Sequence, residues 1–389
     1  MKERAVGALL GLAVGDALGT TYEFDALEQR DYPLLATGPA TDVVGGGPFD
    51  VAAGAVTDDT QMAVCLGRSL AERGRLDVDD VARRYVAWSG EAFDIGNQTR
   101  DALGRIATGT AAAVAGLATW QQSGRRAAGN GSLMRTAPIA VALATRRSPH
   151  GRGGAVEPFS PEVRREAAVI DAAIADSMIT HADPRCVLAC AAFDAAIMSA
   201  IVAAHEGAAH EGAAREGAAR EGASMLVAAQ RALGTASARL AEQWREIASR
   251  PFDARLGPGL AIGRDDLAAI DSAREDLTRD LEAATADDPR LYTPELHLHR
   301  TAGFVRVAFR LAFWHCVHTP SWRDALVDVA SRGGDADTNA AITGALLGAR
   351  DGVSAIPTAW IDRVLSARQH GSEEWGDAHH PRHLLVLAE

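Results

Sequence analysis

Alanine-rich segments with apolar residues three and four positions apart recur along the whole chain. The alternation of apolar and polar residues that is typical of half-buried strands is almost absent. This period predicts α helices, so we expect an all-α fold with one multi-helix core, and a single domain over residues 1–389. The helical segments are residues 5–19, 61–73, 81–89, 169–179, 184–203, 225–248, 265–284, 302–316 and 339–350.

Glycines at every fourth position line one face of the first helical segment. Each glycine costs about 1 kcal/mol relative to alanine inside a helix. A run of them therefore predicts that another backbone or a ligand comes very close to that face. The same argument applies to two glycines near the C-terminus. The positions are Gly7, Gly11, Gly15 and Gly19, and then Gly344 and Gly348.

A low-complexity stretch at residues 204–223 repeats a five-residue unit, first as AHEGA and then as AREGA. It contains no large apolar residue to bury, so we expect a solvated, partly helical insertion between two helices. Residues 146–161 are rich in Arg, Gly, Ser and Pro, which predicts a second surface loop.

Charge and hydropathy exclude several classes of partner. The net charge is -12 and no dense Lys/Arg cluster is present, so no nucleic-acid-binding surface is expected. Lys2 and Arg4 precede an apolar stretch and imitate a signal peptide, but Asp16 follows at once without a clear cleavage site. We find no other stretch long and apolar enough to span a membrane. We therefore expect a cytoplasmic monomer without a membrane partner.

The four cysteines are scattered through segments with helical periodicity. This distribution predicts buried free thiols in a reducing compartment. Two of them lie four residues apart and could share a metal ion, but no second pair completes a zinc site. The positions are Cys65, Cys186, Cys190 and Cys316.

Two acidic signatures lie near opposite ends of the chain, TDDT at residues 57–60 and DADT at residues 335–338. Each follows a glycine-bearing loop and precedes an alanine-rich run. Helix N-caps are one explanation, because Thr and Asp are favoured there. A cap needs only one side-chain oxygen, however, and carboxylate and hydroxyl oxygens are the ligands of Mg²⁺ and Mn²⁺. We predict two halves of one metal site, whose carboxylates would repel one another without cations.

Glu23 is a candidate general acid or base. It lies between Tyr22 and Phe24, which would partly desolvate its carboxyl group and raise the pKa. An ordinary surface glutamate near a helix end is the alternative.

Two polar turns, DIGN at residues 94–97 and GNGS at residues 129–132, each precede a helical run. Exposed amides at a helix start suit phosphate oxygens, although such turns are often only structural. His181 marks a helix end and is open to either interpretation.

In combination these segments resemble the ADP-ribosylglycohydrolase family. The matching pieces stand in the family's order and cover both ends of the chain and most of what lies between. The repeat at 204–223 and the loop near residue 150 depart from the family's length. The pieces are GALLGLAVGDALGTTYEF (7–24), GGGPF and AVTDDTQMA (45–63), DIGN (94–97), GNGSLMRTAPIAV (129–141), ITHADPRC (179–186) and RGGDADTNAAITGALLGA (332–349).

The resemblance implies an all-helical fold with two Mg²⁺ or Mn²⁺ ions in a cleft. It implies metal ligands on one side at Thr57, Asp58 and Asp59, and on the other at Asp335, Asp337 and Thr338. Glu23 and Asp94 would be catalytic, with Asp94 facing the ribose. The substrate would also contact Asn97, Gly129, Asn130, Gly131, Ser132 and His181.

The implied activity is metal-dependent hydrolysis of the N-glycosidic bond between ADP-ribose and an arginine side chain on a protein. The substrate could instead carry O-linked ADP-ribose, on serine or in O-acetyl-ADP-ribose. A non-catalytic homologue that binds ADP-ribose or serves as a structural protein is a further alternative, although all six implied ligands are present. A two-metal phosphoesterase would share the carboxylates, but would leave AMP and ribose phosphate instead of intact ADP-ribose.

Overall fold

The computed structural model describes residues 1–25, 38–146, 160–204, 214–249, 260 and 262–389. Within these residues there are helices and three isolated β-bridges but no strand, which confirms the all-α fold. The α helices are α1 (Lys2–Gly19), α2 (Asp58–Arg73), α3 (Val78–Trp88), α4 (Asn97–Ala107), α5 (Ala112–Gln122), α6 (Ala137–Thr145), α7 (Pro161–Thr180), α8 (Pro184–Ala203), α9 (Ala214–Ser249), α10 (Arg264–Ala283), α11 (Val305–His318), α12 (Trp322–Ser331), α13 (Ala336–Asp351), α14 (Thr358–Ser366) and α15 (Glu373–Ala378). Short 3-10 helices are η1 (Thr20–Tyr22), η2 (Gly47–Phe49), η4 (Val353–Ala355) and η5 (Pro381–Ala388).

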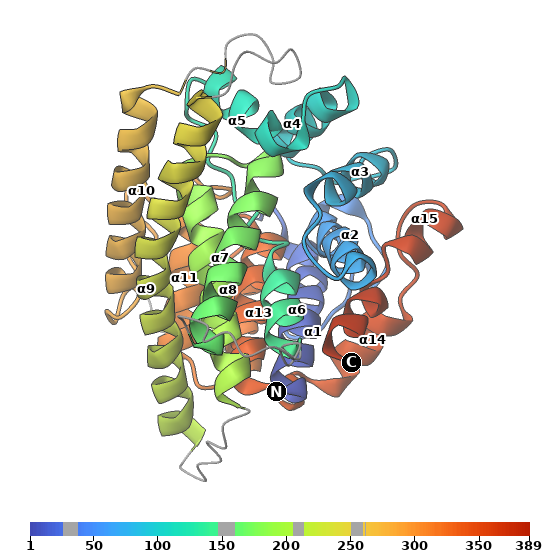
Figure 1. The fold of residues 1–389 in the computed structure, drawn as a ribbon. Helices are drawn as coiled ribbons and strands as arrows, with labels where there is room; N and C mark the ends of the chain where they lie inside the picture. The colour runs from blue at the N-terminus through green and yellow to red at the C-terminus, as the bar shows by residue number, and fades with distance from the viewer. Residues whose placement is uncertain (26–37, 147–159, 205–213, 250–259, 261) are drawn as a thin grey trace, which may run out of the picture.

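The first and the thirteenth helix form the central pair of the bundle (Figure 1). They are antiparallel, because Gly7 faces Gly348 while Gly19 faces Ala336. A Cβ atom on Gly19 would lie 2.2 Å from the carbonyl oxygen of Ala336. The prediction of a close approach at the glycine face is thus confirmed, and the partner is the backbone of α13. This contact brings the C-terminal end of α1 to the start of α13.

The other helices surround this pair. Helix α8 packs against α13, and α7 and α9 cover α8 (Figure 1). Helices α11 and α12 also contact α13, while α2 packs against α3, α6 and η5. The buried apolar side chains of the described residues form a continuous cluster. The predicted buried free thiols are confirmed for Cys65, Cys186, Cys190 and Cys316.

Two segments are long and apolar enough to cross a membrane by length and composition, Lys2–Tyr22 and Pro184–Ala203. The expectation that no stretch after the N-terminus meets this criterion is wrong for the second segment. In both, 83% of the most apolar window is buried inside the protein. Their apolar character is therefore explained by their position in the bundle, because a helix that is buried all round is apolar all round.

Of the low-complexity repeat, residues 205–213 lie outside the described part of the chain. From Ala214 onward the repeat is helical and continues into α9. In its last unit Ala219, Arg220 and Ala223 are exposed, as expected for a solvated segment. Gly222 is the exception, because a Cβ atom there would lie 2.0 Å from the carbonyl oxygen of Cys316 in α11, so this glycine allows the two helices to pack closely. The predicted loop at 146–161 falls mostly on residues 147–159, which are likewise not described.

Candidate active site

Asp16 connects the central helix to the first acidic signature. Its carboxylate is buried and accepts hydrogen bonds from the backbone N–H groups of Thr57 and Thr60, each at 3.1 Å. The hydroxyl groups of Thr57 and Thr60 lie 2.9 and 2.6 Å from it. Asp16 therefore satisfies the first amides of α2, and Thr57 makes no side-chain cap of its own.

Glu23 has the same relation to the second signature. Its side chain is 5% exposed, so the surface alternative is wrong. Its Oε2 atom accepts hydrogen bonds from the backbone N–H groups of Ala336, at 2.6 Å, and Asp337, at 3.3 Å. Asp335 occupies the N-cap position of α13 but makes no side-chain cap.

These contacts show which side chains cap the two helices that begin at the signatures. The two helix starts are satisfied by carboxylates from the α1–η1 segment, Asp16 for α2 and Glu23 for α13. The carboxylates of Asp58 and Asp335 are consequently not used as caps. They are available to face the space between the helices.

The two signatures converge although nearly 280 residues separate them. The hydroxyl of Thr338 lies 3.3 Å from Oδ2 of Asp59. One carboxylate oxygen each from Glu23, Asp335 and Asp337 lies within 4.8 Å of the others. A pocket of about 360 Å³ opens between these elements. Its lining includes Glu23, Asp58, Asp94, Asp335, Asp337 and Thr338.

The electrostatics of this cluster disfavour ionised carboxylates. Burial, followed by the charge of Asp94, raises the pKa of Asp58 well above its usual range. Burial and the charge of Asp337 act in the same way on the pKa values of Asp59 and Glu23. For Asp94, burial and the charge of Asp335 raise the pKa to about 6. Repulsion of this kind is relieved when a cation binds.

The donor set fits a hard divalent cation. The six implied ligands offer only carboxylate and hydroxyl oxygens, which Mg²⁺ and Mn²⁺ prefer. The Oδ1 atom of Asp59 is buried without a hydrogen-bond partner, so one acceptor is unsatisfied within the protein. The described residues that line the pocket include no lysine or arginine. A cation would satisfy both the free oxygen and the excess negative charge.

The GNGS turn lies beside the second signature. The side-chain amide of Asn130 donates a hydrogen bond to Oδ2 of Asp335 at 2.8 Å. Gly129 and Gly131 face the ring of His181, and a Cβ atom on Gly131 would lie 2.9 Å from Cε1 of that ring. These glycines thus let the imidazole line the pocket. Burial, then the charge of Arg135, lowers the pKa of His181 well below its usual range, so the ring is neutral.

Asn97 and Ser132 differ in their placement. Asn97 is exposed and lines the pocket at the first turn of α4. Ser132 is buried outside the lining, and its hydroxyl contacts Ser177 at 2.9 Å and Cys190 at 3.4 Å. The turn therefore offers the pocket residues 129–131, while the Ser132 side chain points into the core.

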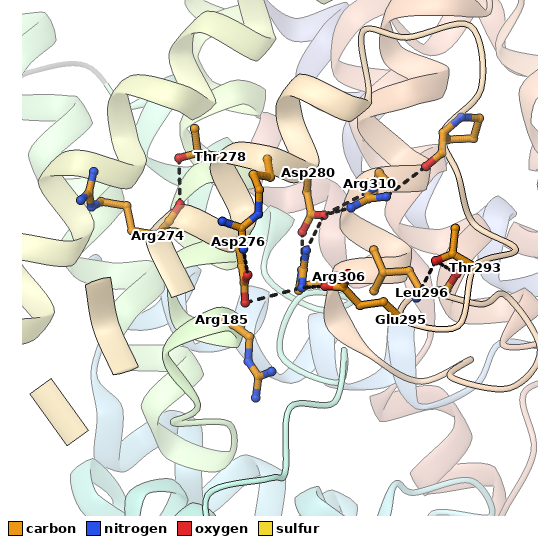
Figure 2. Close-up of polar contacts among 12 residues, drawn as sticks. Arg185, Arg274, Asp276, Thr278, Asp280, Thr293, Glu295, Leu296, Arg306 and Arg310 are labelled. Carbon is orange, nitrogen blue, oxygen red and sulfur yellow. Dashed lines mark hydrogen bonds and ion pairs between the residues drawn. The ribbon is translucent and has the colours of Figure 1, made fainter. Parts of the chain in front are cut away.

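A buried ion network lies next to the part of the pocket wall that the GNGS turn and Gly303 form. The backbone N–H of Val305 donates a hydrogen bond to the carbonyl oxygen of Ala128 at 3.0 Å, and the N–H of Asn130 donates to the carbonyl oxygen of Gly303 at 3.1 Å. This link joins the GNGS turn to the start of α11. Figure 2 shows the next residue, Arg306, bound to Asp280 of α10 at 2.7 Å.

Two residues of this region are not among the site residues predicted from the sequence. Asp16 is the only charged residue between Ala5 and Thr21, and an isolated acid in a close-packed helix was a usable signal of a buried structural role. Phe24 lines the pocket with 69% of its side chain exposed, and its ring gave no signal in the sequence beyond its position after Glu23.

Comparison with known proteins points in one direction. A family model described as ADP-ribosylglycohydrolase matches residues 1–380. The chain is 29% identical to the ADP-ribosylarginine hydrolase Tri1 of Pseudomonas putida, in a match that covers 93% of this chain and 74% of that protein.

Two further matches cover nearly the whole length of the matched protein. The ADP-ribosyl-[dinitrogen reductase] glycohydrolase of Rhodospirillum rubrum is 28% identical, over 93% of this chain and 90% of that protein. A solved structure described as an ADP-ribosylglycohydrolase-related protein complex superposes with a TM-score of 0.59 and 26% identity. That match covers 100% of this chain and 97% of the other.

Proposed function

The chain belongs to the ADP-ribosylglycohydrolase family and is a hydrolase of ADP-ribosylated substrates, and from this premise we propose a specific reaction. The enzyme uses two Mg²⁺ or Mn²⁺ ions to hydrolyse the N-glycosidic bond of ADP-ribosylated arginine on proteins. The names of two relatives, an ADP-ribosylarginine hydrolase and an ADP-ribosyl-[dinitrogen reductase] glycohydrolase, support this choice of substrate.

The observation that carries the proposal is the convergence of carboxylates in a pocket whose described lining contains no arginine or lysine. One group of oxygens for the metal ions comes from the start of α2 and the other from the start of α13. The ions when bound would polarise the bond between C1 and its leaving group and bind ribose hydroxyls and water. The ligands are Thr57, Asp58 and Asp59, and then Asp335, Asp337 and Thr338.

Glu23 is the acid/base residue of this proposal. Water adds across the C1–N bond, so its hydroxyl joins C1 and its proton goes to the departing guanidine nitrogen. The carboxyl of Glu23 accepts the water proton and transfers it to that nitrogen. Two hydrogen bonds from α13 amides fix the orientation of the carboxyl for this transfer.

The remaining pocket residues bind and orient the ADP-ribose. Asp94 accepts hydrogen bonds from ribose hydroxyls. The first turn of α4 enters the pocket with no side-chain cap, so its amides suit phosphate oxygens, as do the amides of residues 129–131. The neutral ring of His181 adds a hydrogen-bonding group without bringing a charge to the metal ligands.

The test is release of free ADP-ribose from an arginine-ADP-ribosylated protein and from a serine-linked peptide, measured in parallel. Each assay contains Mg²⁺, Mn²⁺ or a chelator. We expect metal-dependent release from the arginine substrate and intact ADP-ribose as the product. Release from the serine peptide alone would move the assignment to O-linked substrates, and AMP as product would indicate a phosphoesterase. Binding of ADP-ribose without any release would favour the non-catalytic homologue.

A further inference from the structure

Phe24 is an unusual residue to expose. Its side chain is 69% exposed, which makes it the most exposed large apolar side chain in the described part of the chain. The backbone at Phe24 is left-handed, with φ of 61°, a conformation that costs a non-glycine residue about 1 kcal/mol. Exposure and strain in one residue next to a catalytic site are a reason to look for a ligand.

The strained conformation is fixed by the loop before the second signature. The N–H of Phe24 donates to the carbonyl oxygen of Gly334 at 2.8 Å, and the N–H of Gly334 donates to that of Asp25 at 2.9 Å. Gly333 faces Asp25 so closely that a Cβ atom would lie 2.0 Å from its carbonyl oxygen. The same loop carries Asp335, so the ring is placed by the segment that supplies a metal ligand.

The ring of Phe24, which lines the pocket, is the first of a continuous row of aromatic rings. Its centroid lies 6.1 Å from that of Phe49, which lies 5.5 Å from that of Phe93. Phe93 in turn lies 4.5 Å from the ring of His370. Phe93 directly precedes Asp94 in the chain, so both ends of the Phe24–Phe93 row adjoin carboxylates that line the pocket.

An aromatic face beside several carboxylates favours a planar cation. A guanidinium group stacks on aromatic rings and pairs with carboxylates, and both interactions are available here. The described lining contains no arginine or lysine that already occupies this role. A serine acceptor carries no such cation and would gain nothing from the ring.

The position of Phe24 separates the acceptor from the nucleotide. The acceptor nitrogen is bonded directly to C1, which must lie at the carboxylate cluster with Glu23. The adenine is separated from C1 by two riboses and the diphosphate. Phe24 follows Glu23 directly, on the turn whose carboxylate belongs to the cluster. The ring therefore lies at the reacting end of the substrate.

We propose that Phe24 forms the acceptor subsite, where its ring stacks against the guanidinium of the ADP-ribosylated arginine and makes the enzyme selective for that linkage. This inference rests on the proposed function, because it names the group recognised at the same site. Phe24 is a specificity-determining residue here, while Glu23 transfers the proton and Asp94 holds the ribose.

The experiment compares Phe24→Leu, Phe24→Tyr and the matched control Phe49→Leu, whose residue belongs to the aromatic row but not to the pocket lining. We measure kcat and KM for ADP-ribosylarginine and the inhibition constant of the product ADP-ribose. We expect kcat/KM to fall about fivefold in Phe24→Leu, as loss of one cation–π contact implies, and to be retained in Phe24→Tyr. Inhibition by ADP-ribose should stay unchanged.

Three results would overturn the inference. Unchanged kcat/KM in Phe24→Leu would show that the ring does not contact the acceptor. A fivefold loss in Phe49→Leu as well would indicate a general effect of the aromatic row. Equal weakening of inhibition by ADP-ribose would place the ring against the nucleotide. If the wild-type protein releases ADP-ribose from serine alone, the arginine assignment fails as well, and that outcome is visible without any variant.

Discussion

Two groups of buried carboxylates in this protein have opposite surroundings. Asp280 of α10 is fully buried and is bound by Arg306 at 2.7 Å and by Arg310 (Figure 2). Arg306 also contacts Glu295 at 2.8 Å. In contrast, the pocket gathers the carboxylates of Glu23, Asp58, Asp94, Asp335 and Asp337 with no arginine or lysine in its described lining.

This difference distinguishes a carboxylate that stabilises the fold, Asp280, from the pocket carboxylates, to which we assign a function. Burying an ion is costly unless it is paired, and the Asp280 network is paired within the protein. The pocket cluster leaves the same cost uncompensated, which raises the pKa values of its carboxyl groups. The described lining of the pocket contains no arginine or lysine of the kind that pairs with Asp280, and this supports our proposal that a bound cation compensates the pocket carboxylates.

The largest expected effect comes from removing a carboxylate that binds metal. Asp337→Asn should reduce Mg²⁺-dependent release of ADP-ribose by about 1,000-fold or more, because the amide cannot replace the charge that holds the ion. Circular dichroism should show an unchanged helical fold. Full activity in this variant would contradict the assignment of Asp337 as a ligand.

Removing the charge of Asp280, which is paired with arginines, should affect stability and not activity. Asp280→Asn removes the buried anion that Arg306 and Arg310 share, so we expect the free energy of unfolding to fall by about 3–5 kcal/mol, with or without metal. Urea denaturation measures this loss. The control is Asp276→Asn, since the part-exposed Asp276 lies 3.5 Å from Arg306 and should contribute under about 1 kcal/mol. Equal losses in the two variants would refute the distinction.

Asp328 is a second buried carboxylate with partners inside the protein, and its lowered pKa predicts how the stability of the protein changes with pH. Burial alone would raise the pKa of Asp328, but hydrogen bonds from His315 and Arg332 outweigh burial and lower it to about 2. A lowered pKa in the folded state stabilises the protein above the unfolded value near 4, and this contribution of about 2–3 kcal/mol is lost as pH falls to 2.

The measurement for Asp328 is the unfolding free energy of wild type and Asp328→Asn between pH 5 and pH 3. The gap between the two proteins should narrow by about 1 kcal/mol, because part of the contribution is lost in that interval. A constant gap would mean that the ion pairs of Asp328 do not shift its titration.

The smallest expected effect is a gain in stability instead of a loss. In metal-free protein, kept so by a chelator, Asp58→Asn removes one of several carboxyl groups that repel one another. The free energy of unfolding at pH 7.5 should therefore rise by about 1 kcal/mol. Saturating Mn²⁺ should reverse the order of wild type and variant, because wild type gains more from the ion. Thermal unfolding in chelator and in Mn²⁺ checks both statements. A loss of stability in chelator would indicate that the protein itself compensates Asp58.

The sequence predicted those features that depend on local pattern. Glycines every fourth residue predicted the close contact of α1, because only a backbone approach justifies their cost. The paired carboxylates of the signatures predicted a shared site, since one cap does not need two acids. Helix α6, apolar on every side, was expected only as a helical run after the GNGS turn and without bounds, because a fully buried helix has no one-sided stripe.

Features that depend on distant contacts could not be predicted. The capping of α2 by Asp16 and of α13 by Glu23 depends on how three helices meet. The inward rotation of Ser132 depends on Ser177 and Cys190, which lie in other helices. Hydrogen bonds to residues many positions away leave no periodic signal in the sequence.

The most direct test of the metal centre is an equilibrium titration of the folded, metal-free protein with Mn²⁺, which counts the ions bound per chain. The proposed two-metal centre predicts two ions in wild type, and fewer or more weakly bound ions in Asp337→Asn. Asp280→Asn, measured where it remains folded, should bind as wild type does. Absence of Mn²⁺ and Mg²⁺ binding to the folded wild-type protein would contradict the account.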